Sequence, residues 1–215
     1  KSGGGNPDTN YRLRLAIQKA RTVNMPVDNI ERAVKRATAA DGQNASFDDI
    51  YYEAYGPQGT ALMLHALTDN RNRTVSEVRA ALARGGGRLG ESGSVAYLFD
   101  QLGVVRAALG GKDADDLTLA AIDAGATDVK TDDEAEALEV YTEVGGLRAL
   151  QEALEGLGVE VESADISMVP KTTIGLDEAH AVQVLRLVER LEDLDRIQEV
   201  FTNVDLSAEG MEKVA

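Results

Sequence analysis

Residues 51–67, YYEAYGPQGTALMLHAL, contain two runs of aromatic and aliphatic residues on either side of the segment Gly56-Pro57-Gln58-Gly59. Runs of this length and composition are typical of β-strands, and Gly and Pro between them are typical of a turn. We therefore expect a β-hairpin with strands over 51–55 and 60–67. This hairpin is the start of an α/β domain, because helical spacing of apolar residues resumes after it.

Two patterns describe the rest of the chain beyond its first 40 residues. Residues 103–169 show the order strand, helix, strand twice, which is the order of a ferredoxin-like α+β sandwich. The hairpin is followed by a predicted helix over about 74–84 and a strand over 94–99, and the tail adds a helix over about 177–191 and a strand over 198–204. Because a lone helix and strand cannot close a core, we expect the tail to return to the hairpin and complete a second βαββαβ-like sheet.

The predicted fold class is α+β with three domains, an N-terminal helical domain and two ferredoxin-like α/β domains, one inserted in the other. Residues 1–48 form the basic helical domain, with two amphipathic helices separated by Met25-Pro26. Residues 49–102 and 170–215 form a discontinuous domain, and residues 103–169 form the inserted acidic domain.

Composition excludes several classes of protein. The chain has 215 residues, of which 43% are apolar, with no Cys and only two His. No Cys means no disulfide, no Cys-ligated zinc and no thiol catalysis, and it fits a reducing compartment. No apolar run is long enough for a membrane span and the start does not resemble a signal peptide, so we expect a cytoplasmic protein without a membrane partner.

Charge is segregated along the sequence. The net charge of −15 would by itself argue against a nucleic-acid partner, because phosphate binding draws on Lys and Arg. Residues 1–40, however, carry eight basic and three acidic groups, whereas residues 101–215 carry nine basic and 26 acidic groups. The sequence therefore predicts a basic N-terminal surface and an acidic remainder that could meet a protein partner.

Three segments resemble the signature segments of the YebC family in order and spacing: 24–33 (NMPVDNIERA), 67–74 (LTDNRNRT) and 90–95 (GESGSV). The resemblance extends over essentially the whole chain. It implies a three-domain protein around a wide central groove, with DNA binding in some members and ribosome-linked translation roles in others. The family's Lys- and His-rich start is not found here, so we expect an N-terminally truncated chain, and Val27 stands where Lys is common.

Basic residues in three places are the candidates for nucleic-acid contact. The faces of the first two helices carry Arg12, Arg14, Lys19, Arg21, Arg32, Lys35 and Arg36. Arg71 and Arg73 are expected on a loop before a helix, where they either contact phosphate or pair with acids. Arg84 and Arg88 flank a glycine-rich stretch that is either an anion-binding loop or a flexible turn. Tyr97 and the strand tyrosines are expected in the core. Tyr11 is the one candidate for stacking on a base, although core packing is the favoured interpretation for it too.

Catalysis would need carboxylates that converge on a metal. Asp69, Glu77 and Glu91 are the candidates in this sequence, although surface charge and helix capping explain them more simply. We expect no cofactor, and a divalent metal, magnesium or manganese, only if the protein is a nuclease.

The function predicted from these features is a DNA-binding transcriptional regulator of the YebC type, which contacts mostly phosphate and has little base specificity. One alternative is a ribosome-associated translation factor that acts on RNA through the same basic surface. Another is a metal-dependent nuclease that acts on branched DNA.

Overall fold

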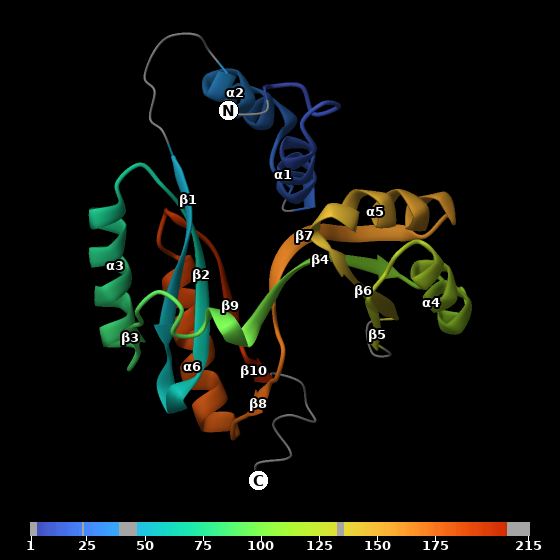
Figure 1. The fold of residues 1–215 in the computed structure, drawn as a ribbon. Helices are drawn as coiled ribbons and strands as arrows, with labels where there is room; N and C mark the ends of the chain where they lie inside the picture. The colour runs from blue at the N-terminus through green and yellow to red at the C-terminus, as the bar shows by residue number, and fades with distance from the viewer. Residues whose placement is uncertain (1–3, 23, 39–46, 133–135, 206–215) are drawn as a thin grey trace. The chain divides into compact units, whose positions relative to one another are not determined.

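The computed structural model describes residues 4–22, 24–38, 47–132 and 136–205 (Figure 1). The fold is a mixed α/β fold with antiparallel sheets. The chain forms two compact units. Unit 1 comprises Lys1–Gln43 and Gln101–Ser167, and unit 2 comprises Asn44–Asp100 and Met168–Ala215. The division of the chain into three domains stays a prediction.

Unit 2 contains a four-stranded antiparallel sheet in the order β3-β1-β2-β9. Its central hairpin is the predicted one, with β1 (Asp48–Tyr55) and β2 (Ala61–Thr68) paired from Asp48 opposite Thr68 to Tyr55 opposite Ala61. Between them, Gln58 and Gly59 adopt positive φ angles of 57° and 74°, which close the tight connection.

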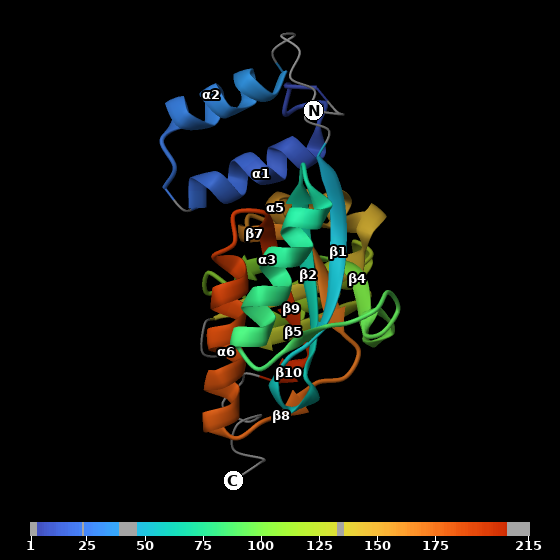
Figure 2. The same cartoon turned by 90° about the vertical axis from the view of Figure 1, so that its left-hand side faces the viewer.

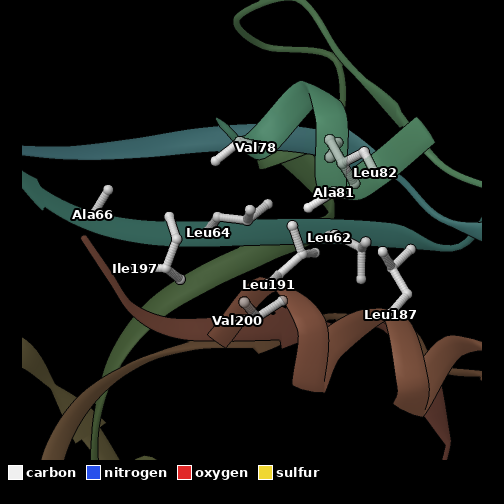
Figure 3. Packing of buried hydrophobic residues seen from close by; sticks show 11 residues of the cluster. Leu62, Leu64, Ala66, Val78, Ala81, Leu82, Leu187, Leu191, Ile197 and Val200 are labelled. Carbon is white, nitrogen blue, oxygen red and sulfur yellow. The ribbon is translucent and has the colours of Figure 1, made fainter. Parts of the chain in front are cut away.

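Two helices, α3 (Arg71–Arg84) and α6 (Glu178–Glu192), lie side by side on one face of this sheet (Figure 2). Alternate residues of β2, such as Leu62 and Leu64, point to the helices and are fully buried. Figure 3 shows how they pack in a single apolar cluster with the inward residues of both helices, among them Val78, Leu82, Leu187 and Leu191. This cluster fixes the position of α3 on the sheet.

The strand order of unit 2 corrects the predicted βαββαβ-like pattern. The edge strand β3 is only Arg88–Leu89 and pairs with β1, and β9 (Ile197–Thr202) pairs with β2 on the other side. The element order is therefore ββαβ, and after the chain has passed through unit 1 it continues with αβ. A small parallel pair also joins β8 (Ile174–Gly175) to β10 (Val204–Asp205). The predicted strand over 94–99 is wrong, because Ala96–Leu98 is a 3₁₀ turn and β4 (Phe99–Ala108) begins only after it.

Unit 1 contains the helices α1 (Tyr11–Thr22) and α2 (Val27–Thr38) and a sheet in the order β5-β6-β4-β7. The sheet strands are β4, β5 (Asp128–Asp132), β6 (Ala137–Glu143) and β7 (Glu160–Pro170), and the helices between them are α4 (Ala114–Asp123) and α5 (Leu147–Gly156). The β-α-β-β-α-β order predicted for this part of the chain is present. Its core joins Val105, Leu138 and Val140 of the sheet to Leu150 and Leu154 of α5.

No helix in the described ranges is long and apolar enough to cross a membrane.

Arg106 of β4 lies on the sheet face opposite this core and neutralises carboxylates from three strands. Its guanidinium contacts Asp132 of β5 at 3.0 Å, Glu139 of β6 at 3.3 Å and Glu162 of β7 at 3.0 Å. The Arg106 side chain is 29% exposed, so solvent screens these contacts only in part. Arg106 thus links β4 to its neighbours β5, β6 and β7 through their carboxylates.

We predict that Arg106→Met lowers the free energy of unfolding by about 1–3 kcal/mol, because it leaves three carboxylates without their shared cation. Urea denaturation at pH 7 measures the change. The matched control is Arg148→Met, which removes an exposed i,i+4 pair with Glu152 at 2.8 Å and is expected to cost less than about 0.5 kcal/mol. Equal effects of the two substitutions would contradict the prediction.

Candidate functional site

An open depression of about 380 Å³ lies where the end of α3 meets β3. It is lined by Arg79, Ala83, Gly87, Arg88, Leu89, Gly90 and Glu91. Arg79 and Arg88 are both exposed, and neither forms an ion pair within the part of the chain that the structure describes. Glu91 is the acidic residue of the rim. Two unpaired guanidiniums beside an open depression provide donors for an anion such as phosphate.

Local geometry places Arg88 beside the end of α3. The helix ends at Arg84, and the N–H of Gly87 donates to the carbonyl of Leu82 over 2.8 Å, which turns the chain back toward the sheet. A Cβ on Gly87 would lie only 2.7 Å from the carbonyl oxygen of Tyr55, so the close approach of this turn to β1 requires glycine. Register then puts Arg88 opposite Tyr55.

Arg88 is held by an aromatic ring. Its guanidinium carbon lies 4.3 Å from the centre of the Tyr55 ring, a cation–π contact that keeps the charge while restricting the side chain. The Tyr55 hydroxyl in turn donates to the carbonyl of Ser94 over 3.1 Å. Arg88 is therefore pre-positioned by β1 and by the loop that follows β3.

The loop over residues 90–97 already binds an anionic group, the side-chain carboxylate of Glu53. The backbone N–H groups of Gly93, Val95 and Ala96 donate to the carboxylate of Glu53 over 2.6, 2.7 and 2.8 Å. Burial raises the pKa of Glu53, but these backbone donors outweigh it and hold the pKa below its usual range. The converging N–H groups expected of an anion-binding loop are present, and Glu53 occupies them.

Arg71 and Arg73 lie within α3 and not on a loop before it, which corrects the sequence prediction. Asn70 caps the helix by accepting from the N–H of Arg73 over 3.1 Å, so the helix begins one turn earlier than predicted. Arg71 contacts Asp48 at 2.6 Å and Arg73 contacts Glu77 at 2.9 Å. The sequence left phosphate contact and pairing with acids open for these residues, and in the structure both arginines pair with acids.

The basic residues of the N-terminal helices whose side chains are described lie in two environments. Arg14 donates to the backbone carbonyls of Pro7 and Asp8 over 3.2 and 3.1 Å, so it braces the segment before α1. Arg21, Arg32 and Lys35 are exposed, and Arg32 also donates to the Asp28 carbonyl over 3.1 Å. The side chains of Arg12, Lys19 and Arg36 lie outside the described residues, as does that of Tyr11.

The candidate metal-binding carboxylates are not brought together. Asp69 contacts Arg196 at 3.2 Å, Glu77 contacts Arg73, and Glu91 lies on the rim of the depression. In the described ranges, no group of three or more His, Asp or Glu side chains is arranged to hold a metal ion. Each of these carboxylates except Glu91 has a basic partner that accounts for its position.

Arg79 is the site residue that sequence reasoning did not identify. It lies on the exposed face of α3, and only the pairing of β3 with β1 puts it at the same depression as Arg88. Arg84, which was predicted, is exposed at the last position of α3 but does not line the depression.

Fold and site together define a mixed α/β protein with an arginine-lined depression at the edge of an antiparallel sheet. Two family models match it, the TACO1/YebC protein N-terminal domain over residues 1–40 and the TACO1/YebC second and third domain over residues 47–204. The chain belongs to the TACO1/YebC family.

Individual relatives agree with this assignment. A probable transcriptional regulatory protein of Herpetosiphon aurantiacus is 49% identical over 216 residues, which cover 100% of this chain and 84% of the relative. One from Thermobifida fusca is 47% identical, with 100% and 86% covered. The crystal structure of a conserved hypothetical protein from Aquifex aeolicus is similar with a TM-score of 0.82 and 42% identity, and covers 94% of this chain and 83% of that one.

Proposed function

We propose that this chain is a nucleic-acid-binding regulatory protein that contacts the phosphates of DNA and has little base specificity. The observation that carries the proposal is the depression with Arg79 and Arg88, two exposed arginines that have no acidic partner in the described ranges. The names of the relatives, probable transcriptional regulatory proteins, support a regulatory role.

Charge distribution supports the same proposal. The depression lies outside the stretch 101–215 that carries most of the acidic groups, and residues 1–40 are net basic. A protein with a total charge of −15 is repelled by DNA over most of its surface, so binding must concentrate where arginines are unpaired. Contacts of this kind position a protein on the backbone but carry no sequence information by themselves.

The test is a titration of the protein against labelled duplex DNA and structured RNA of equal length at several salt concentrations. Salt-sensitive retention of DNA is expected, with a slope of log K against log salt of about −0.9 for each phosphate contact. Retention of RNA in preference to DNA would support the translation-factor alternative instead. Absence of binding to both nucleic acids at low salt would overturn the proposal, and cleavage of four-way-junction DNA with magnesium would replace it by the nuclease.

We predict that Arg32→Ala combined with Lys35→Ala weakens duplex binding by about 3–10-fold, because both side chains are exposed on one helix of the basic N-terminal region. The salt slope should become shallower by roughly 2 if each residue makes one phosphate contact. Fluorescence anisotropy at three salt concentrations measures both quantities. An unchanged slope would remove α2 from the interface.

A further inference from the structure

Tyr97 is the most exposed of the large hydrophobic residues in the described ranges. Its side chain is 66% exposed, whereas Val95 and Phe99 on either side are 0% and 4% exposed. The expected place of Tyr97 in the core is therefore wrong. Val95 and Phe99 pack with Met63 and Phe201 on the sheet face opposite the helices, and this anchoring turns the intervening ring outward.

The turn that carries Tyr97 is held at both ends. The Glu53 carboxylate accepts from the N–H of Ala96, directly before Tyr97, over 2.8 Å. The carbonyl of Leu98, directly after it, accepts from the N–H of Lys171 over 2.9 Å. An aromatic side chain on so constrained a backbone loses little conformational entropy when it stacks on another ring.

One cationic side chain without an acidic partner in the described ranges, that of Arg88, is connected to the same loop. Arg88 lies over Tyr55, whose hydroxyl donates to Ser94 three residues before Tyr97. Lys171 is 48% exposed, but its ammonium pairs with the carboxylate of Asp100 at 3.3 Å, so it is not a free cation of this surface. An exposed ring on a loop that is connected to an unpaired guanidinium fits a site for unpaired nucleotides, in which bases stack on aromatic rings and the backbone lies near cations.

We propose that Tyr97 stacks on an unpaired nucleobase, so that the ligand of this surface is nucleic acid with single-stranded or locally opened segments. The inference rests on the proposed nucleic-acid function and specifies the class of ligand. A paired base within a duplex is already stacked on both faces, and Tyr97 cannot reach one without opening the helix. Stacking is tolerant of sequence because every base has a π-face, which fits the low base specificity proposed above.

The chain contains no Trp, so Tyr97→Trp introduces a single fluorescent reporter at the site. Titration of this variant with a single-stranded thymidine oligonucleotide is expected to quench its fluorescence. An oligonucleotide of the same length with abasic sites throughout should bind through its phosphates with much less quenching. Equal quenching by both would overturn the inference, because it would show that the signal does not depend on a base.

Affinity measurements give an independent readout. Tyr97→Ala is expected to weaken binding to the thymidine oligonucleotide by on the order of tenfold and to leave duplex affinity within about twofold, whereas Tyr97→Phe should retain the wild-type values. Leu119→Ala, at a residue that is 63% exposed in unit 1, is the matched control for loss of an exposed apolar side chain. If wild-type protein binds duplex DNA and Tyr97→Ala changes neither affinity, this inference fails and the proposed function stands. If wild-type protein binds none of the ligands, both fail.

Discussion

Glu53→Gln is expected to lower the free energy of unfolding by about 2–4 kcal/mol at pH 7. The Glu53 carboxylate accepts three backbone N–H bonds from residues 93, 95 and 96, over distances of 2.6 to 2.8 Å. Charge-assisted bonds of this kind are stronger than neutral ones. A Gln amide offers one acceptor oxygen and turns an NH₂ group toward the remaining donors, which leaves backbone N–H groups unsatisfied.

The pH dependence of this effect follows from the pKa of Glu53, which backbone hydrogen bonds hold below its usual range although burial acts in the opposite direction. A carboxyl with a depressed folded-state pKa contributes stability above its unfolded pKa, about 4.3, and loses it as the pH falls through the folded value. The difference between wild type and Glu53→Gln should therefore be constant from pH 8 to about pH 6 and shrink below about pH 4.

Urea denaturation at pH 7, 5 and 3.5 measures this dependence. Glu91→Gln is the matched control, because Glu91 is exposed on the same loop and accepts none of these bonds, and its effect should stay within about 0.5 kcal/mol. A destabilisation by Glu53→Gln that grows as the pH falls would show that Glu53 is not stabilised as the carboxylate.

The part of the fold that periodicity determines was predictable from sequence. The hairpin of β1 and β2 follows from two apolar runs around a Gly-Pro turn, and its register from Asp48 to Tyr55 has no irregularity. The β-α-β-β-α-β order of 103–169 was predictable for the same reason. Each of these elements buries one face, and the spacing of its own apolar residues shows which face that is.

The segment 94–99 was not predictable because a contact from far away in the sequence decides its conformation. Its apolar composition favours a strand, but Glu53, about 40 residues earlier, accepts the N–H groups that a strand would use to pair with its neighbour. No property of residues 94–99 by themselves indicates that bond. The exposure of Tyr97 follows from it, so the candidate for stacking could not be found by composition.

The candidate site, like the fold, was predictable from sequence only in part. Sequence identified Arg88 and Arg84 because they flank glycines, but it could not tell which arginines acids would neutralise. Arg71 is neutralised by Asp48, which precedes it by 23 residues and is brought to it by pairing of Asp48 with Thr68. Unpaired charge is a property of the folded surface, and it distinguishes Arg79 from Arg71 on the same helix.

Replacing Arg79, Arg84 and Arg88 together with Ala is expected to weaken binding to nucleic acid by about 10²-fold at low salt. Arg79 and Arg88 line the depression, and Arg84 is exposed at the end of the same helix. Each guanidinium can donate two hydrogen bonds to one phosphate, and a net contribution of about 1 kcal/mol from each of the three residues corresponds to about 10²-fold in affinity. The contribution is largest when the side chain is already positioned before binding. Arg88 meets that condition through its contact with Tyr55.

The measurement is the affinity for one labelled oligonucleotide at salt concentrations from about 50 to 300 mM. Loss of three phosphate contacts should make the slope of log K against log salt shallower by about 2–3. The matched control is the triple substitution of Lys112, Lys130 and Arg148 with Ala, which changes the net charge equally within the acidic part of unit 1.

The control separates a local interface from a general charge effect. If binding responds only to total charge, both triple variants will lose affinity equally, and the depression has no special role. If only the variant that lacks Arg79, Arg84 and Arg88 loses affinity and salt dependence, the phosphates lie against the depression. In urea denaturation, the free energy of unfolding of both variants should change by less than about 1 kcal/mol, because the substituted side chains lie on the surface. A loss of binding is then not caused by a loss of folding.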